Sequence, residues 1–496
     1  MMTQTLEDSP LYPIVNCRSM AYFGASNNLM AMGSLILSAQ LATGFNGPIY
    51  PVHPTEDTVQ GLKAYRSVAD LPEVPDMALF VLPPRLVAET LAACGEKGIR
   101  RAVIVSGGFQ EVGPEGAERQ KEVVAVAARY GIRFIGPNCI GVVNTHHRLN
   151  TTLFLYDEKP GFIGLASQSG SFVAQMFNHL TRHAINFSTA FSVGNEANLD
   201  IVDCMEYLAA DPRTKVIGLY IEGIRRGEAF VKAARAIAPR KPIVAYYVGG
   251  SETGSRAGFS HTGAMAGPDA VYDGIFRQCD ILRARSVTEL FDFCWVLGAM
   301  PLPAGRRLVI QTHSGGPGAA AADHCGREGL DLPLLSEKTV ERLKPFLPHT
   351  ASFGNPVDMT FARNQADYFT AIPDVLLREP GADMLLLYIL VPSLMIQRSL
   401  EMMGLPPEDI AAKTDEIIEA QTGALAALVG THGRPVIGYT YRGIEETFCR
   451  QLMEKGVPVF AGPERAARAL TALVQYRKIR NRQDGSAMDK VGTVTS

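Results

Sequence analysis

The sequence predicts an α/β protein with three consecutive domains, each built around a parallel sheet. Short apolar runs alternate with amphipathic helical patterns along most of the 496 residues, and parallel sheets produce this alternation. A chain of this length exceeds what a single hydrophobic core holds. The alternation is interrupted at 150–161 and in the proline-containing stretch 300–305, which gives blocks of about 150 residues. The expected domains span 1–150, 151–300 and 301–476, and a flexible tail follows over 477–496.

Each block contains apolar runs that predict strands. In the first block they are Met20–Gly24, Ile49–Val52, Ala78–Leu82, Ala102–Ser106 and Arg133–Gly136. In the second they are Phe162–Ala166, Phe187–Ser192, Val216–Ile221, Pro242–Tyr247 and Ile281–Arg285. In the third they are Arg307–Thr312, Leu330–Leu335, Met384–Val391, Val436–Thr440 and Val457–Phe460. A long connection in the third block, 399–423, is expected to add a helix near Pro407–Gln421.

The composition excludes several classes of protein. Hydrophobic residues make up 47% of the chain and charged residues 20%, which is typical of a globular protein. The net charge is −3 and the basic residues are dispersed, so neither nucleic acid nor a membrane surface is an expected partner. No apolar run spans a bilayer, and the polar N-terminus lacks a signal-peptide pattern. The eight cysteines include no C-x-x-C pair, which predicts a reduced cytoplasmic protein without a structural metal site.

The first strand of the first block ends in a glycine turn that suits a phosphate. Gly24, Ala25 and Ser26 follow the strand, and the next helix would direct its N-terminal N–H groups and its dipole at a bound anion. The turn is not the complete G-x-G-x-x-G of a dinucleotide site. The second strand ends in Val52 and His53, where a dehydrogenase would place an acidic residue on the ribose. NAD is therefore disfavoured.

The other strands of this block end in residues that would gather at the same rim. They are Pro83 after the third strand, Ser106, Gly108 and Phe109 after the fourth, and Asn138 and Cys139 after the fifth. Ligands of open α/β sheets bind at the carboxyl ends of the strands, which favours a ligand site here. Turn formation alone explains the prolines and glycines equally well.

Two strand–helix turns further along the chain consist mainly of small residues. The first contains Ser167, Gln168, Ser169 and Gly170, and the second contains Gly315, Gly316 and Gly318. Free backbone N–H groups and the helix dipole at such turns favour a bound anion. Turns of this kind are also routine in α/β folds, and most of them bind nothing.

His261 lies in a run of small residues between Gly258 and Gly267 that has neither helical nor strand periodicity. Such a run predicts an ordered loop in which an imidazole is accessible to a reactant. A single histidine is more often a structural residue. Combined with the two anion-favouring turns, however, this loop suggests a phosphate that is handled by histidine.

These segments occur in an order that resembles the NDP-forming acyl-CoA synthetases. The matching segments are Gly24–Ser26, Tyr50–Pro54, Gly107–Glu111, Gly136–Cys139, Ser167–Gly170, Tyr220–Ile224, Ser260–Gly263 and Gly315–Gly318. The resemblance implies an N-terminal Rossmann-like CoA-binding domain followed by two flavodoxin-like domains. It also implies an acid–thiol ligase that interconverts a carboxylic acid, CoA and ATP with acyl-CoA, ADP and phosphate through an acyl phosphate and a phosphohistidine.

The resemblance also implies roles for the candidate residues. His261 would carry the phosphoryl group, and Glu222 would orient its imidazole. The two turns would hold the phosphate, and the rim of the first block would bind CoA. The chain departs from the family in two places, because Thr55 and the segment Tyr247–Gly250 lack the basic residues usual there.

The part of this reaction that the sequence does not provide is a site for the nucleotide. The three blocks account for the chain, and they contain no G-x-x-x-x-G-K-[ST] loop. The resemblance therefore implies that ATP or ADP, with Mg, binds on a separate ATP-grasp β-type subunit, in a heterotetramer. Two alternatives stay open: a CoA-binding regulatory or scaffolding protein that has lost the full reaction cycle, and a phosphohistidine relay protein that does not use CoA.

Overall fold

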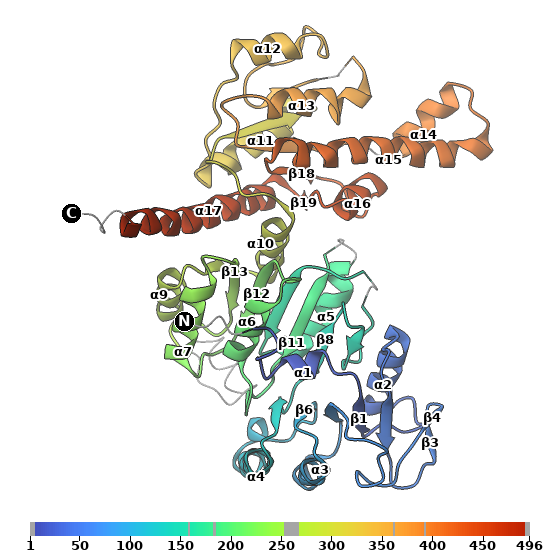
Figure 1. Cartoon of the computed structure of the whole chain (residues 1–496). Helices are drawn as coiled ribbons and strands as arrows, with labels where there is room; N and C mark the ends of the chain where they lie inside the picture. Colours follow the sequence, from blue (N-terminus) through green and yellow to red (C-terminus); the bar gives the residue numbers. More distant parts are fainter. Residues whose placement is uncertain are drawn as a thin grey trace. The chain divides into compact units, whose positions relative to one another are not determined.

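The computed structural model describes residues 5–156, 159–181, 185–251, 267–360, 363–390 and 393–491. The chain forms two compact units, and the boundary between them falls after Leu290. Sheets flanked by helices make up each unit (Figure 1). The predicted phosphoryl carrier, His261, lies outside the described residues.

The first sheet of the first unit has five parallel strands in the order β2-β1-β5-β6-β7. The strands are β1 (Met20–Phe23), β2 (Ile49–Val52), β5 (Met77–Phe80), β6 (Arg101–Ile104) and β7 (Arg133–Ile135). A separate hairpin consists of β3 (Thr58–Val59) and β4 (Leu62–Lys63). Every residue of β1 and β5 is buried, as expected for central strands of a parallel sheet that is covered on both faces.

Three long helices connect these strands, and their ends follow the sequence closely. They are α2 (Met32–Thr43), α3 (Pro84–Lys97) and α4 (Pro114–Tyr130). α3 and α4 begin at proline, whose fixed φ suits the first helical turn. Each helix ends at a glycine with positive φ, namely Gly44, Gly98 and Gly131. Short segments complete this region: α1 (Tyr12–Val15) and the 3-10 turn η1 (Gln110–Val112).

The turn between β1 and α2 requires glycine at two positions. Gly24 has a φ of +97°, and a Cβ there would overlap the carbonyl oxygen of Val81. A Cβ on Gly33, in the first turn of α2, would overlap the carbonyl of Gly24. The start of α2 therefore lies directly against the carboxyl end of β1, which is the arrangement that a phosphate-binding turn needs.

The second sheet has seven strands in the order β14-β13-β12-β10-β11-β8-β9. Five of them are parallel: β10 (Ile163–Ser167), β11 (Phe187–Ser192), β12 (Val216–Ile221), β13 (Ile243–Tyr247) and β14 (Leu282–Ala284). The other two, β8 (Val142–Asn144) and β9 (Leu149–Asn150), are antiparallel and form one edge. This edge comes from the end of the predicted first domain, so residues before 150 complete the second sheet.

The helices of the second sheet are α5 (Gly170–Thr181), α6 (Ile201–Ala210), α7 (Gly227–Ile237) and α9 (Asp269–Gln278), and α10 (Val287–Ala299) begins in the first unit and continues into the second. A capping box starts α6, since Asp200 accepts hydrogen bonds from the helix N–H groups while Asp203 accepts one from the N–H of Asp200. Arg226 forms ion pairs with both carboxylates, which offsets part of their negative charge. The beginning of α6 is thus held firmly beside the loop that follows β12.

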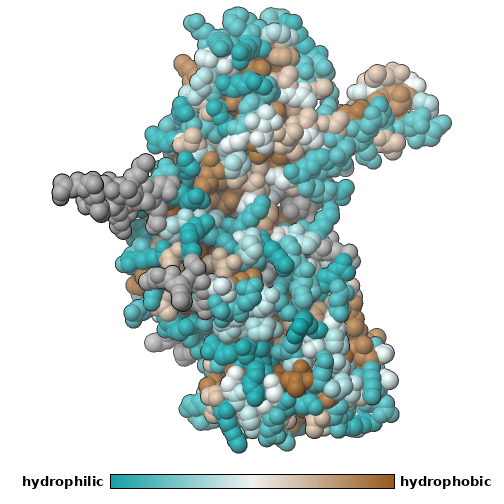
Figure 2. Space-filling model, viewed as in Figure 1, coloured by the Kyte–Doolittle hydropathy of each residue, from teal (hydrophilic) through white to brown (hydrophobic). Residues whose placement is uncertain are grey.

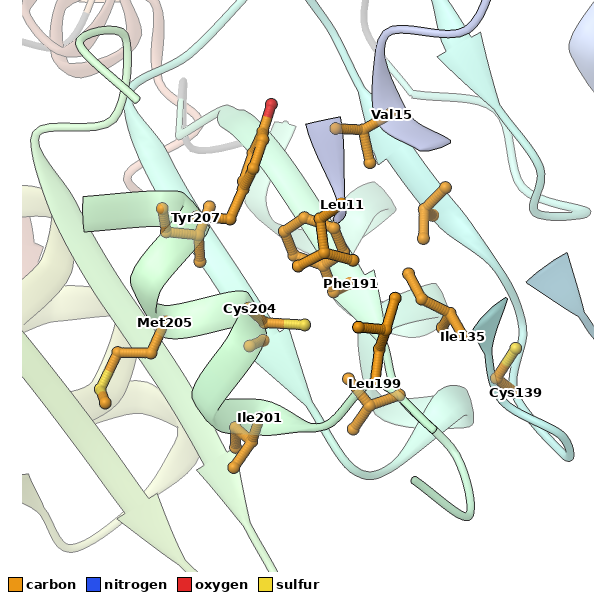
Figure 3. Close-up of a cluster of buried hydrophobic side chains, with 14 of the residues drawn as sticks. Leu11, Val15, Ile135, Cys139, Phe191, Leu199, Ile201, Cys204, Met205 and Tyr207 are labelled. Carbon is orange, nitrogen blue, oxygen red and sulfur yellow. The ribbon is translucent and has the colours of Figure 1, made fainter. Parts of the chain in front are cut away.

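One hydrophobic cluster joins the two sheets of the first unit. Ile135 and Cys139 from the first sheet belong to the same cluster as Leu199, Phe191 and Tyr207 from the second (Figure 3). These side chains are almost completely buried, and burial of one such aromatic side chain contributes about 2–3 kcal/mol. The sheets therefore share a core, and the first 150 residues do not bury their apolar surface alone.

The second unit contains one parallel sheet in the order β16-β15-β17-β18-β19. The strands are β15 (Leu308–Thr312), β16 (Val357–Asp358), β17 (Met384–Tyr388), β18 (Val436–Thr440) and β19 (Val459–Ala461). The helices are α11 (Gly315–Arg327), α12 (Glu337–Leu343), α13 (Ala371–Leu377), α14 (Ser393–Met402), α15 (Pro407–His432), α16 (Thr447–Glu454) and α17 (Pro463–Val491), with a 3-10 turn η2 (Gln365–Tyr368). α17 packs against α11, and Arg465 near its start forms a bidentate ion pair with Asp292 at 2.7 and 2.9 Å.

The structure confirms the α/β class and most of the predicted strands, but one predicted strand is wrong. Leu330–Leu335 makes only a single bridge, between Asp331 and Arg307, because Pro333 cannot donate an N–H to a ladder. β16 occupies the position beside β15 instead. The helix expected near Pro407–Gln421 is present as the longer α15, and α17 continues to Val491 through most of the predicted tail.

Across the described ranges, no helix combines the length and apolar character needed to cross a membrane. All eight cysteines are buried and free. The described residues also contain no cluster of three or more His, Cys, Asp or Glu side chains that could hold a metal ion.

Candidate functional site

A cavity of about 550 Å³ lies in the first unit, where the strand ends of the first sheet meet the β10–α5 turn of the second. Its lining residues are Met32, Ile36, Val81, Leu82, Val105, Ser106, Gly107, Asn138, Cys139, Ile140, Leu153, Gln168, Gly170, Ser171, Gly194 and Asn195. Carboxyl ends of parallel strands and a helix N-terminus thus surround one space. This is the usual setting of a ligand site in an α/β fold.

The cavity brings together predicted residues from two distant parts of the sequence. Ser106, Asn138 and Cys139 come from the rim of the first sheet, and Gln168 and Gly170 come from the predicted phosphate turn. The sequence motifs indicated CoA binding for the first set of residues and phosphate binding for the second. In the structure they line one cavity.

The other predicted rim residues do not line this cavity. They are Gly24, Ser26, Val52, His53, Pro83, Gly108 and Phe109. The ring of Phe109 is fully buried in the core of the first sheet, so it has no surface for a ligand. The backbone N–H groups of Gly108 and Phe109 donate to Oε1 of Glu111, at 2.6 and 3.0 Å, and already have an acceptor. The imidazole of His53 accepts a hydrogen bond from the N–H of Glu56 at 3.0 Å.

Cys139 contributes shape to the cavity rather than a nucleophile. Its thiol is buried and donates to the carbonyl oxygen of Ile104 at 3.3 Å. Burial raises the pKa of the Cys139 thiol to about 12, so the thiol stays protonated at neutral pH. Asn138 precedes it with a φ of +56°, a conformation that asparagine tolerates better than most residues.

A segment that the sequence analysis did not single out connects the two sides of the cavity. A Cβ on Gly194 would overlap the carbonyl of Pro137, so only glycine allows the segment to approach the first sheet this closely. The N–H of Asn195 donates to Pro137 at 2.9 Å, and its amide donates to Oε2 of Glu111 at 2.6 Å. Its amide oxygen accepts from Asn138 at 3.3 Å. The only signal in the sequence was a Gly-Asn pair directly after a strand.

The β10–α5 turn places the N-terminus of α5 at the cavity. The hydroxyl of Ser167 donates to the carbonyl of Ser169 at 2.8 Å and accepts from the N–H of Ser169 at 3.1 Å, which closes the turn. α5 then starts at Gly170, and both Gly170 and Ser171 line the cavity. Backbone N–H groups at the start of a helix attract an anion, and the helix dipole adds about 0.3–1 kcal/mol.

Gln168 fastens this turn to Glu222. Its side-chain oxygen accepts hydrogen bonds from the N–H groups of Glu222, at 2.5 Å, and Gly223, at 3.0 Å. Its side-chain nitrogen donates to the carbonyl of Gly223 at 2.7 Å. The predicted orienting carboxylate is therefore held by its backbone beside the predicted phosphate turn, although the two lie 54 residues apart in the sequence.

Glu196 is a buried carboxylate that contacts Gln168, and no sequence motif indicated it. Its Oε2 accepts from the side-chain nitrogen of Gln168 at 2.8 Å, and its Oε1 accepts from the N–H of Ile201 at 2.9 Å. Its side chain is only 3% exposed, and Nε of Arg225 lies 3.8 Å away. Burial raises the pKa of Glu196 to about 7, although these hydrogen bonds and Arg225 favour the ionised form.

The second predicted phosphate turn belongs to the second unit. α11 begins at Gly315, and Ser314, Gly315 and Gly316 are exposed, so the first N–H groups of the helix are accessible. A Cβ on Gly318 would press on Thr312 and Pro356, which explains a small residue there. The turn has the geometry of an anion site.

Comparison with known proteins identifies the family. The model of the CoA binding domain matches residues 18–145, and the model of the succinyl-CoA ligase-like flavodoxin domain matches residues 160–297. The chain is 39% identical to acetate–CoA ligase (ADP-forming) II subunit alpha of Pyrococcus furiosus over 464 residues, which cover 93% of this chain and 97% of that protein. This chain belongs to the family of ADP-forming acetate–CoA ligase α subunits. The resemblance inferred from the sequence motifs is thereby confirmed.

Two further members of this ligase family extend the match. The I subunit alpha of the same organism is 34% identical over 476 residues, covering 94% of this chain and 98% of that protein. A solved structure of the dinucleotide-forming acetyl-coenzyme A synthetase 1 of Ca. Korarchaeum cryptofilum, in complex with phosphate and ADP, has a TM-score of 0.83 and 32% identity. That match covers 96% of this chain and 98% of the other. Both units of the present chain therefore belong to the ligase α-subunit fold.

For this ligase subunit we expect Glu196→Gln to remove a pH dependence of stability. The folded-state pKa of Glu196, about 7, lies above the usual value of 4.5. Its stabilising contribution is therefore complete below pH 4.5 and is lost as the pH rises through 7. This difference between the two pKa values corresponds to roughly 3 kcal/mol in the free energy of unfolding. Urea unfolding from about pH 4 to pH 8 should show the free energy of unfolding of the wild type falling by this amount relative to Glu196→Gln; parallel profiles would contradict the expectation.

Proposed function

We propose that this chain is the α-type subunit of an ADP-forming acyl-CoA ligase. The reaction interconverts a carboxylic acid, CoA and ATP with acyl-CoA, ADP and phosphate, through an acyl phosphate and a phosphorylated His261. The observation that carries the proposal is the cavity of about 550 Å³, in which the rim of the first sheet faces the N-terminus of α5. A CoA thiol and an acyl phosphate must meet in one space, and this cavity provides the groups for both.

CoA is assigned to the first sheet. Its phosphates would lie at the turn between Gly24 and Gly33, where the start of α2 is pressed against β1 by two glycines. Its thiol end would enter the cavity beside Asn138 and Cys139. Met32, the first residue of α2, also lines this cavity, so the phosphate turn and the thiol site are continuous.

The acyl-transfer step requires an anion site at the thiol. The CoA sulfur attacks the carbonyl carbon of the acyl phosphate, the bond from that carbon to the phosphate oxygen breaks, and the thiol proton passes to the departing phosphate. Inorganic phosphate leaves with the electron pair and would be stabilised by the N–H groups of Gly170 and Ser171 at the start of α5. Oriented backbone donors are effective here because they are fixed before charge develops.

The phosphoryl-transfer step is assigned to His261 and Glu222. A carboxylate oxygen of the acid attacks the phosphorus of phospho-His261, and the N–P bond breaks to give the acyl phosphate and free imidazole. Glu222 would hold that imidazole in the reactive tautomer. Support comes from Gln168, which ties the backbone of Glu222 to the β10–α5 turn. We also propose the α11 turn at Gly315, Gly316 and Gly318 as a phosphate site of the second unit.

The nucleotide is assigned to another chain. The family members that match this chain over almost their whole length are named alpha subunits, so a separate subunit completes those enzymes. We propose an ATP-grasp β-type subunit that binds ATP or ADP with Mg²⁺, in a heterotetramer. Phosphoryl transfer depends mainly on positioning and charge neutralisation, which a metal-bound nucleotide on the partner would supply.

Calorimetry on the full-length chain tests the CoA site. CoA should bind and NAD should give no heat, because the second strand ends in Val52 and His53, where a dinucleotide site has an acidic residue for the ribose. Ile140→Trp fills the cavity and should weaken CoA binding at least tenfold, whereas Val112→Trp, on a residue that is 61% exposed and outside the cavity, should leave it unchanged. Tighter binding of NAD than of CoA, or wild-type CoA affinity in Ile140→Trp, would overturn this assignment.

A further inference from the structure

Glu111, in the turn η1, begins a chain of side-chain hydrogen bonds that reaches the cavity of the first unit. Its Oε1 accepts from the backbone N–H groups of Gly108 and Phe109, and its Oε2 accepts from the side-chain nitrogen of Asn195 at 2.6 Å. Burial disfavours the charged form, but these hydrogen bonds outweigh it and lower the pKa of Glu111. At neutral pH this carboxylate can therefore only accept hydrogen bonds.

The side-chain amide of Asn195 has a single orientation in this chain. Its nitrogen donates both to Oε2 of Glu111 and to Oε1 of Gln120, the latter at 3.0 Å, so both of its N–H groups are used. The nitrogen of Gln120 donates in turn to Oε1 of Gln110 at 2.9 Å. Amides carry donors and an acceptor and could turn, whereas the carboxylate of Glu111 only accepts. Glu111 therefore sets the direction of the whole chain, and the side-chain oxygen of Asn195 faces away from it.

The orientation of Asn195 fixes that of Asn138, which lines the cavity. The side-chain nitrogen of Asn138 donates to Oδ1 of Asn195 at 3.3 Å. Because an amide carries its acceptor and its donors on different sides, Oδ1 of Asn138 faces elsewhere. This oxygen lies beside Gly107, where a Cβ would come within 3.2 Å of it, and Gly107 also lines the cavity. Within the described ranges, no protein group donates a hydrogen bond to Oδ1 of Asn138.

We infer that Glu111 is a positioning residue for acyl transfer, because through Asn195 it makes Asn138 present its oxygen, and not its nitrogen, to the thiol end of CoA. The hydrogen-bond donors at that end of CoA are the thiol and the N–H of the neighbouring amide, and an amide oxygen can hold either of them. The nitrogen of Asn138 in the same place would leave donor facing donor, which is costly away from water. The inference rests on the proposed function, because it assumes that the thiol end of CoA lies beside Asn138.

Glu111→Gln tests this inference because it keeps the size of the side chain and replaces one acceptor by a donor. Its oxygen stays with the N–H groups of Gly108 and Phe109, so its nitrogen faces Asn195. Asn195 must then turn, and Asn138 presents its nitrogen to the cavity. Calorimetry on the full-length chain should show CoA binding weakened about tenfold, the effect of one lost hydrogen bond. Glu118→Gln is the control, on an acid that is 71% exposed in α4, where Figure 2 shows a mainly hydrophilic surface, and it should bind CoA like the wild type.

The double variant Glu111→Gln/Asn195→Asp moves the carboxylate one position along the chain. The carboxylate at position 195 accepts from both of its neighbours, so Asn138 should again present its oxygen to the cavity. Gln110 and Gln120 can turn their amides to match. CoA affinity should return to within about threefold of the wild type. A role of Glu111 in stability alone would predict no recovery from a second substitution in the same buried chain.

Desulfo-CoA identifies which donor of CoA the oxygen of Asn138 holds. If it holds the thiol, the wild type should bind CoA more tightly than desulfo-CoA, and Glu111→Gln should lose this preference. If it holds the neighbouring amide N–H, Glu111→Gln should weaken the binding of both ligands by the same factor.

The outcomes separate this inference from the proposed function. Wild-type CoA affinity in Glu111→Gln, or no recovery of affinity in the double variant, would overturn the inference alone. If Glu111→Gln does not fold, Asn138→Gly gives a second measurement. Glycine tolerates the φ of +56° at this position and removes the oxygen, so CoA should bind about tenfold more weakly, and unchanged affinity would also overturn the inference. Absence of CoA binding in the wild type rejects the proposed function instead.

Discussion

His261→Ala is expected to reduce acyl-CoA formation by on the order of 10⁴-fold or more in the complete enzyme, because loss of a covalent carrier removes a whole reaction path. The wild type, incubated with its nucleotide-binding partner and labelled ATP, should acquire label that is lost in acid and stable in base. His261→Ala should acquire none. CoA binding should be unchanged, since CoA is assigned to the first sheet and His261 only to the phosphoryl group.

The matched control is His349→Ala. His349 is an exposed histidine of the second unit, so its replacement should leave both labelling and turnover at wild-type levels. Label that persists in His261→Ala would place the phosphoryl group on a different residue. In that case the histidine loop would have no chemical role, and the proposed path of the phosphoryl group would be wrong.

Glu222→Gln is expected to slow phosphoryl transfer by about 10²–10⁴-fold, which is the range of a positioned acid–base partner. The substitution keeps the size of the side chain, and the backbone hydrogen bond from Glu222 to Gln168 does not depend on the carboxylate. Folding and CoA affinity should therefore be preserved. Single-turnover measurement of phosphoryl transfer separates this step from CoA binding.

Glu228→Gln serves as the control for Glu222, because Glu228 is an exposed acid in the first turn of α7. This variant should transfer phosphoryl groups at the wild-type rate. An equal rate in Glu222→Gln would remove Glu222 from the site and leave Gln168 as a purely structural contact. Glu222→Asp provides a further test, because it keeps the charge and should retain more activity than Glu222→Gln if the carboxylate orients the imidazole.

Runs of apolar and small residues made most strands predictable, but the short antiparallel pair β8 and β9 was missed. β11, β12 and β18 have the predicted bounds because buried parallel strands consist of uninterrupted apolar or small residues. β8 and β9 were missed because an antiparallel pair of two or three residues leaves no periodicity to read. β8 joins the second sheet by pairing with β11, so Asn144 lies opposite Thr189, and β9 pairs with β8.

The position of the cavity could be predicted in part because turn residues line it. The small residues of Ser167–Gly170 and the pair Asn138–Cys139 drew attention in the sequence, and the structure places them around one cavity. Glu196 was missed because a glutamate in a loop after a strand resembles a solvent-exposed residue. Its burial depends on Gln168 and Ile201, and the first of these contacts spans 28 residues. Phe109 was predicted to contact a ligand because of its place at the rim, but its ring is buried in the core.

The measurement that tests the central claim most directly is ATP-dependent acyl-CoA formation by the purified chain, with and without an ATP-grasp β-type subunit. The account assigns CoA, the phosphohistidine and the acid to this chain and the nucleotide to its partner. Acetate, CoA and ATP should therefore give no acetyl-CoA with the chain alone, and turnover should appear when the partner is added. Sustained ATP-dependent acyl-CoA formation by the partner-free chain, or no turnover with the partner present on any of the acids tested, would contradict it.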